Sequence, residues 1–161
     1  MSFSRGLIGE ELWVEYLDSK GHDDVELSPK GKVFYEYDVS SNKNGKRFTY
    51  EVKYDSKAYM WAERRKTPDN PNLYIEFQNT KQGKDSGILM SEADFYVYMI
   101  VNKEVTECYV FNRDLLLSHL INSSYKKVGN SSYGDNNAKG WIPPLSKLKK
   151  TDSFVYSINI I

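Results

Sequence analysis

A strict alternation of apolar and polar side chains after a turn signal constrains the fold of this chain more than any other feature. The turn is Asn42-Lys43-Asn44-Gly45, and an Asn-Gly pair favours a tight hairpin turn. In the strand predicted at Arg47–Tyr54, every second side chain is aromatic or β-branched: Phe48, Tyr50, Val52 and Tyr54. The side chains on the other face are polar: Thr49, Glu51, Lys53 and Asp55. With a first strand predicted at Val33–Val39, the pattern indicates a β-hairpin with one apolar and one polar face.

The segments around this hairpin alternate between helical and strand patterns. Apolar side chains at helical spacing and a terminal glycine predict a helix over Phe3–Lys20, and Asn112 is the expected N-cap of a later helix. Ser56–Arg65 is either a short helix or an ordered loop, and Ser91–Asp94 starts a helical turn. Further strands are predicted at Asn72–Gln78, Phe95–Val101, Val105–Phe111, Tyr125–Val128 and Ser153–Ile161. The order predicts one α/β (α+β) domain built on a central mixed sheet flanked by helices.

Composition excludes several classes of protein. The 161 residues include 22 basic and 22 acidic side chains, which argues against a binder that relies on bulk positive charge. No apolar run approaches the roughly 20 residues of a membrane helix, and the first residues lack a secretory signal pattern. Cys108 is the single cysteine, so no internal disulfide forms. We therefore expect a cytoplasmic protein that does not associate with membranes.

The balanced charge hides a gradient along the chain. Residues 1–40 contain nine acidic and four basic side chains, whereas residues 122–161 contain two acidic and six basic. Residues 43–66 contain eight basic side chains against three acidic. This distribution indicates either a cation site beside an anion-binding surface or ordinary surface scatter.

Polar side chains of three predicted strands supply a candidate site. Pairing of these strands side by side would gather Asp38, Glu51, Lys53, Glu76 and Gln78. Clustered carboxylates repel one another unless a cation compensates, and hard oxygen ligands suit Mg²⁺ or Mn²⁺. A neighbouring lysine would orient the water attacking a phosphodiester. The alternative is a solvated Asp38 beside an ordinary Glu51–Lys53 ion pair.

Two short motifs in this region resemble the signature of the PD-(D/E)XK nuclease superfamily. Tyr37-Asp38 is followed, after twelve residues, by Glu51-Val52-Lys53, which is similar to the D…E-x-K motif of that superfamily. Tyr37 stands where the motif usually has proline. Glu36 competes with Asp38 for the motif position if the strand register slips.

The rest of the chain resembles particular groups within that superfamily. The first helix is similar to that of archaeal-type Holliday-junction resolvases, in which a glutamate of this helix joins the metal site. Glu10 is the better match for that glutamate, and Glu11 is the second. Downstream, three segments resemble small phage-encoded endonucleases: Asn72–Phe77, Gly83–Ile88 and Ala93–Tyr96. The likeness extends over most of residues 6–145.

This resemblance implies a restriction-endonuclease-like core of the αβββαβ type, with residues 1–161 forming a single nuclease-like domain. The implied ligands of Mg²⁺ or Mn²⁺ are Asp38, Glu51 and Glu10. Lys53 would assist the attacking water, and the implied accessory residues are Glu76 and Gln78. The implied protein is a divalent-metal-dependent endonuclease that hydrolyses phosphodiester bonds in DNA, encoded by a phage and acting in the host cytoplasm.

Basic and polar side chains outside this cluster are candidates for contact with nucleic acid. They are Arg64, Arg65, Lys81, Lys84 and Ser86, and for each the alternative is a solvated surface role. A homodimer would suit symmetric cleavage of two strands. The alternative function is a catalytically inactive module of the nuclease fold that binds nucleic acid or a host protein. His22 and His119 lack zinc-site spacing, and no phosphate-binding loop of the P-loop type is present.

Overall fold

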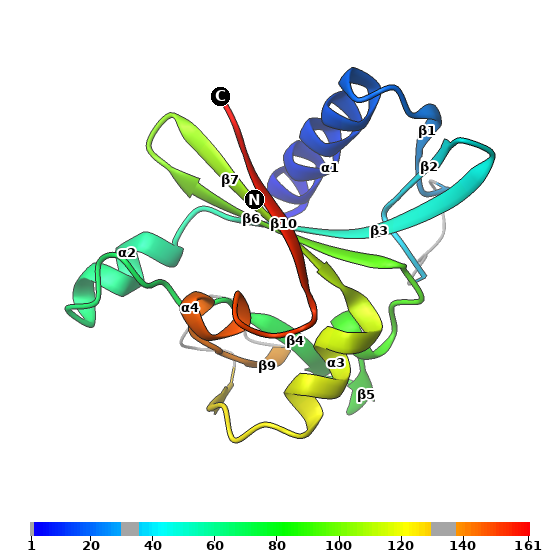
Figure 1. Ribbon diagram of the computed structural model, residues 1–161. Coiled ribbons are helices and arrows are strands. Elements are labelled where there is room, and N and C mark those ends of the chain that lie inside the picture. Colours follow the sequence, from blue (N-terminus) through cyan, green and yellow to red (C-terminus); the bar gives the residue numbers. More distant parts are fainter. Residues whose placement is uncertain (1, 30–35, 130–137) are drawn as a thin grey trace.

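A six-stranded mixed sheet forms the centre of the part of the chain that the structure describes, residues 2–29, 36–129 and 138–161 (Figure 1). In this computed structural model the strands follow the order β1-β2-β3-β6-β7-β10. Their bounds are β1 (Asp23–Leu27), β2 (Val39–Lys43), β3 (Lys46–Asp55), β6 (Phe95–Asn102), β7 (Val105–Asn112) and β10 (Phe154–Ile160). β3 and β6 run parallel, and the other neighbouring pairs of this sheet run antiparallel.

Helices cover both faces of the main sheet (Figure 1). The helix α1 (Ser2–Ser19) lies on one face. The opposite face carries three further α-helices and a 3-10 helix: α2 (Ala58–Arg64), α3 (Arg113–Ile121), α4 (Leu145–Leu148) and η1 (Gly87–Leu89). A second sheet of order β5-β4-β9-β8 lies on the same side. Its strands are β4 (Ile75–Asn79), β5 (Lys84–Asp85), β8 (Lys127–Val128) and β9 (Ala138–Trp141).

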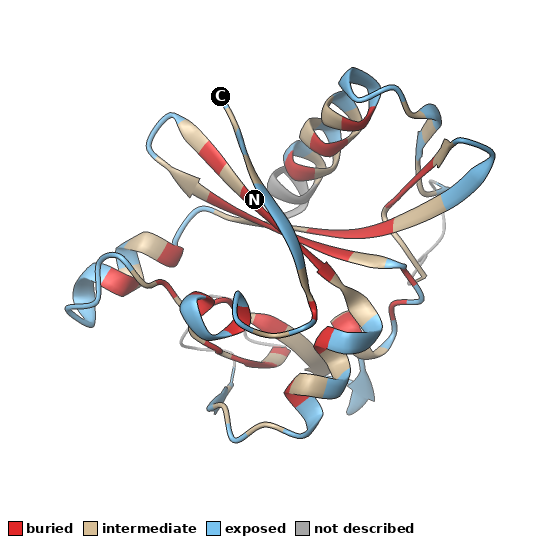
Figure 2. Cartoon of the chain, viewed as in Figure 1, coloured by how far each residue is buried: buried red, intermediate tan, exposed pale blue. Residues whose placement is uncertain are grey.

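Strand β6 contributes to an apolar core on each face of the main sheet. Val97 and Met99 join the core beneath α1, whereas Tyr96, Tyr98 and Ile100 join the opposite core. Figure 2 shows the buried residues running along the central strands. A strand that is apolar on both faces is most stable at the centre of a sheet, which explains why β6 lies directly beside β3.

The predicted hairpin is confirmed at its turn and in its second strand. β2 and β3 pair across Asn44 and Gly45, whose φ angles of 52° and 76° suit a tight hairpin turn. The predicted first strand at Val33–Val39 is wrong, because β2 begins at Val39 and residues 36–38 lie outside any strand. Residues 33–35 of that prediction lie outside the described residues.

The side-by-side pairing expected for the second and third polar strands is also wrong. The first six elements do follow the order αβββαβ, but β4 leaves the main sheet and pairs with β5 and β9. β6 takes the position beside β3, because β6 is buried on both faces whereas most β4 residues are only half-buried. The central sheet is mixed as predicted, and the second sheet was not predicted.

Most of the remaining elements match their predictions. Residues 58–64 are helical, and the side chain of Asn112 caps α3 by accepting a hydrogen bond from the Leu115 backbone N–H at 3.0 Å. The helical turn expected at Ser91–Asp94 lies instead at Gly87–Leu89. Strand β1 was not predicted, because three of the five side chains in Asp23–Leu27 are carboxylates and only Val25 and Leu27 are apolar. Within the described chain, every helix is too short or too polar to cross a membrane.

Candidate active site

The polar face of β3 carries an ion pair that is directed away from α1. The Lys53 Nζ lies 3.2 Å from a Glu51 carboxylate oxygen, and the Glu51 side chain is only 9% exposed. Tyr50 and Val52 point to the opposite face, into the core beneath α1. The alternation of the strand therefore separates the charged pair from this core, as the sequence predicted.

Asp38 is fixed beside Glu51 by hydrogen bonds at the start of β2. Its backbone N–H donates to the Tyr50 carbonyl at 2.8 Å, and its carboxylate accepts from the Val52 backbone N–H, also at 2.8 Å. The Asp38 carboxylate thus takes the hydrogen bond from the Val52 N–H that a backbone carbonyl would accept if β2 began earlier in the chain. This explains why β2 begins only at Val39. The backbone carbonyl of Glu36 accepts from the Glu92 N–H at 2.8 Å.

The third carboxylate of this group comes from α1. A Cβ atom at Gly9 would lie only 2.9 Å from the Tyr54 Cβ, so the glycine lets α1 approach β3 closely. Glu10, the next residue, is half-buried, whereas Glu11 is exposed. Burial raises the pKa of Glu10 to about 7, and the negative charges of Asp38 and Glu51 contribute to the rise.

Burial is the largest influence on the pKa values in this group, and the charges of neighbouring side chains modify its effect. Burial raises the pKa of Glu51, an effect that Lys53 opposes and Asp38 reinforces. For Lys53, burial is the largest single influence and lowers the pKa, but Glu51, Tyr96, Asp38 and Glu76 together outweigh burial and place the pKa above its usual value. The single ammonium group therefore stays protonated and does not balance the carboxylates around it.

Glu76 reaches the same group from the second sheet. Its negative charge also contributes to the raised pKa of Lys53. The Ser86 hydroxyl donates a hydrogen bond to the Glu76 carboxylate at 2.6 Å. Gly87 has a φ of +54°, and a Cβ there would lie 2.2 Å from the Glu76 carbonyl oxygen, so glycine is required at this turn. Gln78 lies beyond an irregularity in β4 and pairs with Asp85 and Lys139.

Tyr96 belongs to the group but was missed by the sequence reasoning. It lies on β6 directly opposite Glu51 in the parallel register and is fully buried. Burial raises the pKa of Tyr96 above its usual range, and the charges of Lys53, Glu51 and Glu76 also influence it. The alternation in Phe95–Val101 places Tyr96 on one face of its strand, but no local signal indicates that β6 pairs with β3.

The donor chemistry of the group fits a hard divalent cation. Three carboxylates, those of Glu10, Asp38 and Glu51, interact electrostatically within one partly buried region. Their oxygen atoms are ligands of the kind that Mg²⁺ and Mn²⁺ prefer. Among residues 2–29, 36–129 and 138–161, no three His, Cys, Asp or Glu side chains are already close enough together to hold a metal ion.

Comparison with solved structures identifies the fold. The chain is similar to the bacterial homing endonuclease I-Ssp6803I, with a TM-score of 0.51 and 18% sequence identity over 85% of this chain and 88% of that one. The chain has a nuclease-like fold. No known family model matches the sequence, and neither does any curated protein. The predicted fold class, a mixed α+β chain with a central mixed sheet flanked by helices, is confirmed.

The basic residues predicted to contact nucleic acid lie at separate places on this nuclease-like fold. Arg64 and Arg65 are exposed at the end of α2, where the Arg64 guanidinium lies 5.1 Å from the centre of the Trp61 ring. Lys81 and Lys84 are exposed around β5, and Figure 1 shows α2 at the left and β5 at the lower right, apart from each other. Ser86 is half-buried and bonded to Glu76. The structure therefore does not bring these residues into one patch.

Proposed function

We propose that this chain is a divalent-metal-dependent nuclease of the PD-(D/E)XK superfamily that hydrolyses phosphodiester bonds in DNA as an endonuclease. The observation that carries the proposal is the convergence of Glu10, Asp38 and the Glu51–Lys53 pair in a nuclease-like fold. These residues match, position by position, the motif residues that the sequence resembles. The structural neighbour, a homing endonuclease, supports the same class of reaction. We propose that residues 1–161 form a single such domain.

In this proposal Glu10, Asp38 and Glu51 hold Mg²⁺ or Mn²⁺. The ion, when bound, neutralises phosphate charge and lowers the pKa of a coordinated water. To share one ion, the three carboxylates would have to rotate toward a common point, because no such ligand set is preassembled within the described residues. Repulsion from Asp38 and Glu51 adds to the burial that raises the pKa of Glu10. The ion would offset that repulsion and leave all three groups ionised.

Lys53 would orient the attacking water and stabilise charge on the phosphate. Because its pKa is raised, the ammonium keeps its proton at neutral pH and acts as a hydrogen-bond donor, not as a general base. Glu76, held by Ser86, would act as an accessory group that fixes the orientation of Lys53. We assign Gln78 the outer accessory position on β4.

The exposed basic residues would hold the DNA backbone on either side of the cut. Arg64 and Arg65 on α2 and Lys81 and Lys84 around β5 would contact different stretches of one duplex, since α2 and β5 are drawn apart in Figure 1. A homodimer would place two such sites on the two strands and permit cleavage of both.

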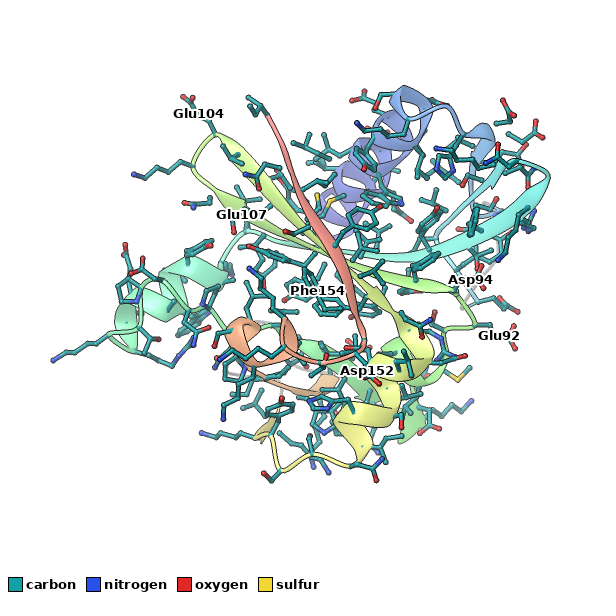
Figure 3. All side chains as sticks on the ribbon, viewed as in Figure 1. Glu92, Asp94, Glu104, Glu107, Asp152 and Phe154 are labelled. Carbon is teal, nitrogen blue, oxygen red and sulfur yellow. The ribbon has the colours of Figure 1, made fainter. Side chains whose placement is uncertain are left out.

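A cleavage panel tests this function. The protein is incubated with Mg²⁺ or Mn²⁺ and with linear duplex, single-stranded and branched DNA and RNA. We expect cleavage of DNA that Glu51→Gln abolishes, together with loss of the Mn²⁺-induced rise in melting temperature. The matched control is Glu104→Gln, an exposed carboxylate in the β6–β7 turn (Figure 3). A protein that cuts none of these substrates with either ion contradicts the proposal.

The Glu51–Lys53 contact also favours a second candidate, an inactive module that binds nucleic acid or a host protein. In that case the ion pair takes the place of the metal ion, and no ligand set is preassembled among the described residues. This alternative predicts equal DNA binding with and without EDTA and no thermal shift with Mn²⁺. The nuclease predicts a thermal shift that Glu51→Gln removes.

A further inference from the structure

Two tyrosines on the same face of β6 differ in how their hydroxyl groups are satisfied. The Tyr98 hydroxyl donates to the Asp55 carboxylate at 2.5 Å and accepts from the Tyr74 backbone N–H at 2.9 Å. The Tyr96 hydroxyl is fully buried, yet it has no hydrogen-bond partner in the described part of the chain. Of these two tyrosines, Tyr98 therefore has a fully hydrogen-bonded hydroxyl, whereas the hydroxyl of Tyr96 is unpaired.

An unpaired buried hydroxyl is rare, because removing a polar group from water without a partner is costly. Tyr96 lies beside charged groups, since Lys53, Glu51, Glu76 and Asp38 all influence its pKa. The register places it directly opposite Glu51, on the face of the sheet that carries the Glu51–Lys53 pair. The hydroxyl is thus an unused donor at the site itself.

The chemistry of the site indicates what this donor would bind. The carboxylates supply acceptors for a cation, whereas a phosphodiester brings oxygen atoms that need donors. Lys53 is one donor, but it is already paired with Glu51. Tyr96 is a second donor on the same face. As a neutral group it would contact a phosphate oxygen without competing with a cation for the carboxylates.

We propose that Tyr96 is a catalytic residue whose hydroxyl donates a hydrogen bond to a non-bridging oxygen of the scissile phosphate. This inference rests on the proposed nuclease function. The bond strengthens as negative charge builds up on that oxygen in the transition state, so its main effect is on the rate and not on DNA affinity. In the absence of substrate the same hydroxyl contributes nothing to the stability of the fold.

The test compares Tyr96→Phe with the matched control Tyr98→Phe. Each variant removes one hydroxyl and keeps a ring in the same core. For Tyr96→Phe we expect single-turnover cleavage of duplex DNA to fall on the order of 100-fold. Its DNA affinity without divalent metal stays within about twofold, and its melting temperature is unchanged or higher. For Tyr98→Phe we expect a lower melting temperature and a cleavage rate close to that of the wild type.

A phosphorothioate at the scissile position identifies the atom that is contacted. Sulfur accepts hydrogen bonds poorly, so for one of the two diastereomers the difference between Tyr96→Phe and wild type should largely disappear. An unchanged difference for both diastereomers overturns the assignment to the phosphate. A Tyr96→Phe protein that cleaves as fast as wild type overturns the inference but leaves the nuclease function intact. A wild-type protein that cleaves nothing overturns both.

Discussion

The ammonium group of Lys53 lies 3.2 Å from the carboxylate of Glu51, two residues away on the same face of β3. This contact balances one negative charge in a region that also holds Asp38, Glu10 and Glu76. The region therefore has an excess of carboxylates over cations, which adds to the effect of burial in raising the pKa values of Glu10 and Glu51.

Replacing Lys53 is expected to reduce the cleavage of DNA without weakening the binding of metal. In Lys53→Met the positive charge is lost, and cleavage should fall by about 100-fold or more because the water loses its donor. Mn²⁺ affinity, measured by calorimetry, should stay equal or increase, because a repelling charge has been removed. Lys150→Met, at an exposed position, serves as the control. Loss of Mn²⁺ binding in Lys53→Met would contradict this role.

Two substitutions of Asp38 distinguish the effect of its hydrogen bond to the Val52 N–H from the effect of its negative charge. Asp38→Asn keeps an oxygen that accepts from the Val52 N–H, so the free energy of unfolding should change little. Asp38→Ala leaves that buried N–H without a partner and should cost about 1–3 kcal/mol. Both variants should lose the Mn²⁺-induced thermal shift. Urea denaturation measures the first effect, and an Asp38→Asn protein that still responds to Mn²⁺ would argue against a role for Asp38 as a ligand.

Glu10 makes the stability of the metal-free protein depend on pH. Its pKa is about 7 in the folded chain against a reference of 4.5, so the folded state binds the proton more tightly than the unfolded state. The resulting stability is fully present below pH 4.5 and is lost as the pH rises through about 7. Glu10→Gln should therefore raise the melting temperature at pH 8 relative to wild type, with little difference near pH 4.

The control for this prediction is Glu15→Gln, an exposed position on the same helix, which should leave the pH profile unchanged. Mn²⁺ affinity in the wild type should increase with pH through the same range, because the ion displaces the proton from Glu10. A melting temperature of the metal-free wild type that rises steadily from pH 5 to pH 8 would contradict the raised pKa of Glu10.

The basic residues of α2 and β5 are expected to act independently on DNA affinity. The double variants Arg64→Ala/Arg65→Ala and Lys81→Ala/Lys84→Ala should each reduce the slope of log affinity against log salt by roughly 2. Their effects should add, because the two pairs lie on separate elements that are drawn apart in Figure 1. Fluorescence anisotropy at several salt concentrations provides the measurement. A slope that neither double variant changes would remove these residues from the interface.

Local patterns were enough to predict the hairpin turn and the shared face of Glu51 and Lys53, because both depend on neighbouring residues alone. The start of β2 was predicted wrongly, since the Asp38 side chain takes the Val52 N–H and ends the ladder at Val39. The place of β4 was also predicted wrongly. The pairing of β3 with β6 depends on burial of both faces of β6, which is a property of the whole sheet.

Tyr96 was missed for the same reason. Its position opposite Glu51 follows from a parallel pairing between distant segments, and no turn or spacing near either residue specifies it. Glu76 was predicted to approach from a neighbouring strand, but it lies on the second sheet, from which its charge influences the pKa of Lys53.

The parallel pairing of β3 with β6 has a consequence for the newly made chain. Parallel strands cannot be joined by a tight turn, and closing the long connection between them carries an entropic cost that only the finished core repays. Glu51 and Tyr96 therefore meet only after β6 has left the ribosome and docked. The nascent chain remains without this pairing during most of its synthesis, so the proposed cleavage of DNA would begin only when folding is nearly finished.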